Sequence, residues 1–262
     1  DSRFVRALLG VKGTFGAWDY DAGYLHSGTN LNNERTGFLR YSRVRTALED
    51  PDSPVGYWRI GENAGLNTQA LYDFISPRIS AAGRTRLDVI DAKATRPLMD
   101  LRGGALGLAL GAEYRRQSVS LTPQTFTDQG DIIGLGYSSY SGVEKVTSAY
   151  VELQAPVLET LELTGALRVD HYDGGDTSTT PKFGVKWSPI DWLALRGTYA
   201  EGFRAPNPAE SGTGGLAAFS TAVDPVRCAA PGNEPQDCDA GPIALITSPN
   251  PDLKPEKSKS TT

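Results

Sequence analysis

Long apolar runs are absent from this 262-residue sequence. No stretch approaches the roughly 18 consecutive apolar residues that a transmembrane helix needs, so no such helix is expected. Two histidines and two cysteines are too few for a convincing zinc site without added carboxylates. A net charge of −5 argues against nucleic acid as a partner, because nucleic-acid binding needs a basic surface. We expect neither a metal nor a cofactor.

What the sequence does contain is alternation with a period of two. In residues 193–199 the odd positions are apolar and the even positions are small or polar, and residues 182–187 follow the same parity. Successive strand residues point to opposite faces, so each segment forms a strand with one apolar and one hydrophilic face. Six further segments repeat the pattern, at 5–15, 18–24, 84–95, 106–115, 148–155 and 162–170.

The segment 84–95 is the least regular of the eight. Leu87 and Val89 share one parity, whereas Ile90 and Ala92 lie on the other. A β-bulge near Ile90 would account for the change of parity.

Short and long connections alternate between these segments. The short connections are residues 15–18, 97–104, 155–161 and 188–192. The long connections are residues 27–80, 122–142 and 205–256, and one of intermediate length covers residues 171–180. Loops beyond about 12–15 residues are uncommon in compact soluble domains. Outer-membrane barrels, in contrast, combine short periplasmic turns with long extracellular loops.

Aromatic residues lie near both ends of the strands. They are Phe15, Trp18, Trp187 and Trp192 beside the short turns, and Tyr24, Tyr114 and Tyr199 towards the other end. This distribution is typical of the two aromatic girdles at the membrane interfaces.

The pattern therefore predicts an all-β fold, the antiparallel wall of a transmembrane β-barrel with about eight strands. The mean hydropathy of −0.33 does not contradict this, because a barrel strand gives only alternate residues to lipid. A soluble β-sandwich, in which the apolar faces pack on each other, is the alternative. The loop asymmetry favours the barrel. On the hydrophilic face we expect ion pairs that line a hydrated lumen, between Arg168, Lys182, Lys186 or Arg196 and Glu113, Glu152 or Asp170.

Cys228 and Cys238 lie in a stretch rich in proline, glycine and aspartate that shows no strand pattern. This setting indicates a disulfide that pins an exposed loop in an oxidising compartment. A role as metal ligands is the alternative.

Two other groups of residues invite a functional interpretation. Asp170 and His171 suggest a catalytic triad, but no Gly-x-Ser-x-Gly nucleophile elbow accompanies them, and a rim position explains His171 more simply. The glycine-rich segment 128–142 reads as a loop, and no helix follows it to cradle a phosphate. Its Tyr137 and Tyr140 are expected to be available for stacking on a ligand.

Two stretches near the end of the sequence carry a family resemblance. Residues 201–210, EGFRAPNPAE, resemble the GFRAP…E signature of the barrel of TonB-dependent outer-membrane receptors. Residues 250–258, NPDLKPEKS, resemble the NPxLKPE motif that opens a following strand in that family. Supporting matches lie at 111–115, 168–172 and 186–193, and together they cover residues 80–260 in the family's order.

The resemblance implies a gated importer, a barrel of about 22 strands that is plugged by an N-terminal domain and energised through TonB. Residues 1–262 would then be a partial barrel domain, an internal piece without the plug domain and the C-terminal strands. The implied location is the outer membrane of a Gram-negative bacterium. The implied partners are outer-membrane lipid, TonB through the plug domain, and a bulky nutrient such as a ferric siderophore, a corrinoid or an oligosaccharide.

Within the motifs, Arg204 and Glu210 join Tyr137 and Tyr140 as the candidate ligand contacts. The interpretation we favour for these charges, with Glu201 and Glu256, is that they fix the packing of the loop at the outer rim, and direct contact with a ligand is the alternative. A receptor of this family implies no enzymatic activity. The alternatives from other classes are a soluble β-sandwich that serves as a binding or adhesion module, and an outer-membrane barrel hydrolase.

Overall fold

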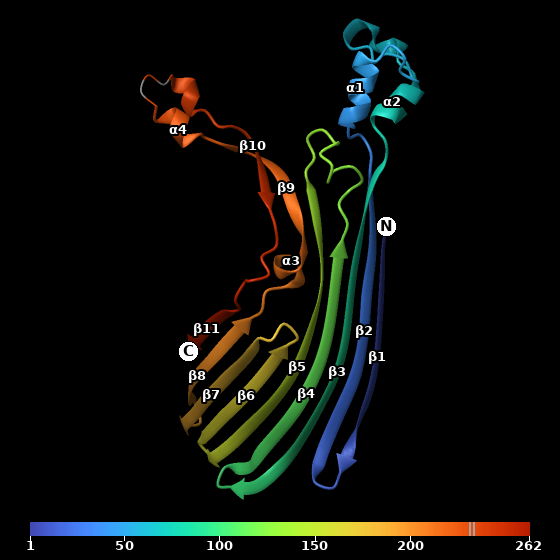
Figure 1. Cartoon of the computed structure of the whole chain (residues 1–262). Coiled ribbons are helices and arrows are strands. Elements are labelled where there is room, and N and C mark those ends of the chain that lie inside the picture. The colour runs from blue at the N-terminus through green and yellow to red at the C-terminus, as the bar shows by residue number, and fades with distance from the viewer. Residues whose placement is uncertain (231, 233) are drawn as a thin grey trace.

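The computed structural model describes residues 1–230, 232 and 234–262, and its main feature is one curved antiparallel sheet (Figure 1). Nine strands cross this sheet in the order β1 to β8 and then β11. Their bounds are Ser2–Phe15, Trp18–Arg35, Ile79–Leu101, Gly104–Leu121, Tyr137–Leu158, Leu161–Tyr172, Thr177–Ile190, Leu193–Arg204 and Glu256–Thr261. Strands β1 and β11 form its two lateral edges, and the sheet is not closed.

All four two-residue turns lie at one end of the sheet, the lower end in Figure 1. They consist of residues 16–17, 102–103, 159–160 and 191–192, and Gly16 adopts the left-handed φ of 61° that a tight turn needs. The segments 36–78, 122–136 and 205–255 leave the sheet at the other end. The predicted alternation of short and long connections is confirmed, although the fourth connection at that end, residues 173–176, is shorter than expected.

Continuous register gives the sheet two distinct faces. Ala22, Ala92, Ala112 and Ala149 lie opposite one another on one face, from β2 to β5. The adjacent positions of the same strands form the other face, where Glu113 pairs with Ser148. The apolar face carries large exposed side chains, among them Leu110 (41%), Leu153 (42%) and Leu163 (41%). The hydrophilic face carries the ion pairs described below.

The bulge expected near Ile90 is not there. Strand β3 pairs without interruption from Gly83 to Pro97 with β4, and its register shift lies between Pro97 and Met99. Ile90 is opposite Tyr24 and Tyr114, so it belongs to the apolar face. Leu87 and Val89, which the sequence pattern placed on the apolar face, point to the hydrophilic face instead.

The buried core of the described residues does not lie on the sheet's apolar face. The buried cluster consists of Val44, Ala47, Leu71 and Ile75, in the segment between β2 and β3. A β-sandwich would bury the apolar face against a second sheet, whereas the side chains of this face are exposed. The sandwich alternative is therefore wrong. Within the described residues, no helix is long and apolar enough to cross a membrane.

The segment between β2 and β3 folds into a small helical unit, which the sequence pattern did not predict. It contains α1 (Tyr41–Glu49), η1 (Gly61–Leu66) and α2 (Gln69–Ile75). Asp131, from the connection between β4 and β5, accepts hydrogen bonds from Arg40 Nε (2.6 Å) and from the Ser42 amide (2.7 Å). The guanidinium of Arg40 also lies 3.7 Å from the centre of the Phe126 ring. These contacts join two long connections into one unit.

Two strands lie in the segment 205–255, which was expected to be a loop. Strand β9 (Thr213–Ala222) pairs with the outer end of β5, and β10 (Gly241–Thr247) pairs with β9. Short helices flank them, namely α3 (Pro208–Ser211), α4 (Pro225–Cys228) and η2 (Pro235–Cys238). The structure joins Cys228 to Cys238 by a disulfide at the tip of this hairpin.

Candidate functional site

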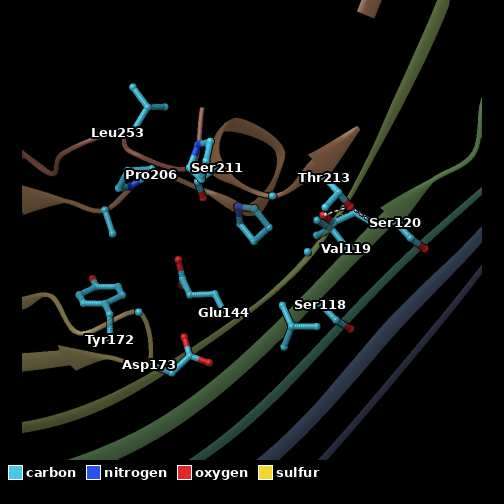
Figure 2. Close-up of a pocket in the computed structure, with 18 of the residues that line it drawn as sticks. Ser118, Val119, Ser120, Glu144, Tyr172, Asp173, Pro206, Ser211, Thr213 and Leu253 are labelled. Atoms are coloured by element: carbon cyan, nitrogen blue, oxygen red, sulfur yellow. Dashed lines mark hydrogen bonds between the residues drawn. The ribbon is translucent and has the colours of Figure 1, made fainter. Parts of the chain in front are cut away.

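A concavity of about 690 Å³ lies where α3 approaches the outer ends of β4 and β5. Figure 2 shows Glu144, Tyr172 and Asp173 on one side of it and Pro206, Ser211 and Leu253 on the other. Gly142 permits this approach, because a Cβ atom there would stand 2.7 Å from the Cβ of Pro208. The concavity is formed by segments from six different parts of the chain, and the sheet's curvature brings them together.

A second concavity of about 490 Å³ adjoins the first and shares Glu144, Tyr172 and Pro208 with it. Its lining includes Arg115, Arg168 and Arg204, which extend from β4, β6 and β8. All three arginines occupy positions of the hydrophilic face. The hydrophilic face therefore ends, towards the long connections, in a chamber whose lining includes three arginines and the acidic residues Glu144, Asp170 and Glu201.

Arg168 is the centre of one ion-pair network in this chamber. Its Nε donates to Asp170 Oδ1 at 2.9 Å, and its Nη2 donates to Ser148 Oγ at 2.9 Å and reaches Glu113 Oε1 at 3.5 Å. The Ser148 hydroxyl donates in turn to Asp170 Oδ1. The expected lumenal pairs of Arg168 with Asp170 and Glu113 are thus present.

Arg115 holds a second carboxylate at the junction of the two concavities. Its Nη2 donates to Glu144 Oε1 at 3.2 Å. The Nε of Arg115 is buried and has no hydrogen-bond partner among the described residues. Neither Arg115 nor Glu144 was singled out from the sequence. Arg115 could have been found from the sequence, because it belongs to the family motif at residues 111–115. Nothing in the local sequence marks Glu144.

The two sequence motifs meet at Arg204. Its Nη1 donates to Glu210 Oε2 at 3.0 Å, and its Nη2 donates to Glu256 Oε1 at 2.8 Å. Asn207 caps α3: its side chain accepts from the amide of Glu210, and its own amide donates to Glu210 Oε2 at 2.9 Å. Pro208 is buried beside them. Arg204 therefore ties the end of β8 to α3 and to the start of β11.

Glu210 lies outside the strands, and its titration provides a test of this tie. Hydrogen bonds from the Arg204 guanidinium and from the Asn207 amide hold the pKa of its carboxyl below the ordinary value of 4.5. A lowered pKa means that this carboxylate stabilises the fold fully above pH 4.5 and loses that effect as the pH falls through the lower, folded-state value.

We therefore expect amide hydrogen exchange in residues 205–212 to rise several-fold when the pH is lowered below this range, after correction for intrinsic exchange. In Glu210→Gln the protection should already be lower at neutral pH and should depend less on pH. Glu159→Gln, in a turn at the opposite end of the sheet, is the matched control and should behave like the wild type. An unchanged pH dependence in Glu210→Gln would show that the tie contributes nothing.

Tyr137 and Tyr140 do not lie in a loop, as the sequence suggested. Both belong to the outer end of β5, where Tyr137 is opposite Ala217 and Tyr140 is opposite Gly214 of β9. They are half-buried, and neither lines the two concavities. The structure thus brings Arg204 and Glu210 together and places the two tyrosines apart from them, under the β9 hairpin.

The histidines have simple structural partners. His171 Nδ1 lies 2.9 Å from the hydroxyl of Thr177 in the next strand. His26 Nδ1 lies 2.7 Å from Asp88 Oδ1, which also accepts from Tyr24. No group of three or more His, Cys, Asp or Glu in the described part of the chain could hold a metal ion.

Fold and site together define part of the wall of an outer-membrane type of β-barrel, with its polar lumen on one face. The family model described as TonB dependent receptor-like, beta-barrel matches residues 4–262. The chain belongs to this family, which is a family of receptors and transporters rather than of enzymes.

Solved structures share the fold at low sequence identity. The siderophore receptor PirA from Acinetobacter baumannii matches with a TM-score of 0.61 and 15% identity, over 99% of this chain and 32% of that chain. A mutant of the ferric enterobactin receptor PfeA from Pseudomonas aeruginosa matches with a TM-score of 0.60 and 18% identity, over the same shares. The chain thus spans about a third of the length of these receptors. No curated protein matches the sequence.

Proposed function

We propose that this chain is part of the barrel domain of an outer-membrane receptor that imports a ferric siderophore with energy delivered through TonB. Residues 1–262 supply wall strands, and the plug domain and the remaining strands belong to the rest of a longer protein. The outer membrane of a Gram-negative bacterium is the proposed location. The observation that carries this proposal is the two-faced sheet of a TonB-dependent receptor barrel, apolar on one face and lined with ion pairs on the other.

The choice of a siderophore over a corrinoid or an oligosaccharide has a narrower basis. Both named structural neighbours are described as siderophore or ferric enterobactin receptors. The chamber around Arg115, Arg168 and Arg204 has a polar lining that suits an oxygen-rich ligand such as a chelate, although each of these arginines is already paired with a carboxylate of the chain. Arg204 and Glu210, tied to each other, shape the rim of this chamber, and Tyr137 and Tyr140 support the hairpin above it.

The location of the wall is tested by labelling single cysteines with a probe that partitions into acyl chains. In the intact receptor we expect labelling at Leu108, Val151 and Leu195, on the apolar face. The neighbouring positions Gly107, Glu152 and Arg196, on the hydrophilic face, are the matched controls and should stay unlabelled. Labelling of both sets, or of neither, would contradict the membrane wall.

Transport is tested separately, by uptake of radiolabelled ferric siderophores in iron-starved cells. A strain with the receptor should take up a siderophore that the deletion strain does not, and removal of TonB should abolish this uptake. Cobalamin and oligosaccharides serve as the competing ligands. Uptake of one of these, with no siderophore transported, would reassign the substrate, and uptake that persists without TonB would reject the proposed mechanism.

A further inference from the structure

The hairpin of β9 and β10 carries large apolar side chains on both of its faces. In the register of the two strands, Leu216, Ile243 and Leu245 share one face, and Phe219 and Ile246 share the other. Ile246 is 70% exposed and Phe219 is 62% exposed. Neither strand contains a charged residue. Antiparallel strands that face water on one side alternate apolar and polar residues, so this hairpin has the composition of strands that are covered on both faces.

The free edge of β10 also lacks the usual protection against pairing. Among the described residues β10 has β9 as its one neighbour, and its register runs from Gly241 to Thr247 without a bulge. Exposed edge strands are usually protected by charged side chains, bulges or proline. In β10 the one such feature is Pro242, its second residue. Residues 243–247 therefore present about 17 Å of unpaired N–H and C=O groups.

The register shows which way this free edge faces. Tyr140 of β5 pairs with Leu121 of β4 on one side and with Gly214 of β9 on the other. Strand β9 therefore lies along the same edge of β5 as β6, which pairs with β5 nearer the short turns. The order β5, β9, β10 consequently runs in the same direction as the order from β5 to β8 and β11. The free edges of β10 and β11 face the same side, as Figure 1 shows.

Strands β10 and β11 also share one chain direction. Strand β8 begins at a short turn and runs away from it, and β11 is antiparallel to β8. Strand β9 is antiparallel to β5, as β6 is, and β10 is antiparallel to β9. Both β10 and β11 thus run towards the short turns. One strand of the opposite direction can therefore pair first with β11 and then with β10, as β5 pairs with both β6 and β9.

We propose that the wall strand next to β11 in the intact receptor extends beyond the membrane and pairs with the free edge of β10. This inference rests on the proposed function, because it takes the chain as part of a longer receptor. Strands of sufficient length occur in this wall: β3 and β5 have 23 and 22 residues, about twice the 9–11 that cross a bilayer. The added strand binds through main-chain hydrogen bonds, and its uncharged side chains cover Ile243 and Ile246.

Residue-resolved hydrogen exchange of the intact receptor in nanodiscs tests this pairing. Successive N–H groups of an antiparallel strand point to opposite neighbours, so a free edge leaves alternate amides unprotected. We expect consecutive protection of the amides of residues 243–247. Residues 219–222 of β9 pair with β10 alone among the described residues, so they are the internal control and should show alternate protection. Alternate protection in residues 243–247 would overturn the proposal.

A lysine on β10 should weaken the pairing. In Ile243→Lys we expect the amides that point away from β9 to exchange about tenfold faster, because the charge would be covered by the added strand. Ser220→Lys is the matched control, since Ser220 stands directly opposite Ile243 on the same face but lies on β9, away from the free edge. It should keep the consecutive protection of the wild type. Equal exchange in the two variants would contradict the proposal.

A photocrosslinker identifies the strand that pairs with β10. In Ile246→benzoylphenylalanine we expect a crosslink within the same chain, to the segment that follows β11 and the next short turn, identified by mass spectrometry. The same probe in place of Val226, a similarly exposed residue of α4, should not reach that segment. A crosslink from position 246 to a second copy, or none, would overturn the proposal. Siderophore uptake that occurs without this crosslink rejects only the pairing, whereas the crosslink without uptake rejects only the importing function.

Discussion

Replacing Leu110 by arginine is expected to lower the free energy of unfolding of the membrane-inserted barrel by about 2–4 kcal/mol. Leu110 projects from the middle of β4 on the apolar face, opposite Ala94 of β3 and Val151 of β5. In a bilayer this exposed side chain faces acyl chains, and a guanidinium in its place would lose most of its hydration. Urea titration of the intact receptor in lipid vesicles, followed by tryptophan fluorescence, measures the change.

Ala109→Arg is the matched control, one residue away on the same strand. Ala109 faces the lumen directly opposite Glu152, so the new guanidinium gains a hydrated setting and a carboxylate. Its effect on the free energy of unfolding should stay within about 0.5 kcal/mol. If both variants lose the same stability, the two faces of the sheet are not a lipid face and a lumen face, and the barrel assignment fails with them.

The strands were predictable because a membrane wall imposes alternation on every residue that crosses it. The same reason explains where the prediction stopped. Leu87 and Val89 are apolar but face the lumen, so β3 carries apolar residues on both parities. Only the register against β2 and β4 decides that Ile90 belongs to the lipid side. A single segment cannot supply that information.

Outside the bilayer, strands need not alternate apolar and polar residues, and the prediction of strands from alternation failed there. The outer end of β5, with Tyr137 and Tyr140, is rich in glycine and serine and reads as a loop. Strand β9 is rich in glycine, alanine, serine and threonine and shows no clean alternation. Its pairing with β5 joins residues more than 70 positions apart, which no local pattern reveals.

The tie at Arg204 shows what the family resemblance added. Glu256 is 52 residues away in sequence, so spacing alone does not bring these charges together. The two motifs flagged both residues independently, and the structure joins them in one cluster. The chamber behind them, which contains Arg115 and Glu144, could not be predicted from the sequence, because the curvature of the sheet forms it.

Gly214→Ala is expected to release β9 from β5 while leaving the barrel wall folded. Gly214 has a φ of 139°, which side-chain-bearing residues rarely adopt, and this conformation alone costs alanine about 1–3 kcal/mol. A Cβ atom there would also overlap the carbonyl oxygen of Ser139, so the two strands must separate. Separation would break the 2.8 Å hydrogen bond between the hydroxyls of Thr213 and Ser141.

Hydrogen exchange of the amides in β9 and β10 measures this release, and both strands should lose protection in Gly214→Ala. Gly130→Ala is the control, because Gly130 also has a positive φ, 70°, but a Cβ atom added there would meet no other atom within 4 Å. It should leave β9 and β10 protected.

Ser211 and Thr213 line the larger concavity, so release of the hairpin would widen the mouth of this concavity. Ligand uptake should then fall in Gly214→Ala without loss of the folded barrel, whereas unchanged uptake would show that the hairpin has no part in holding the ligand.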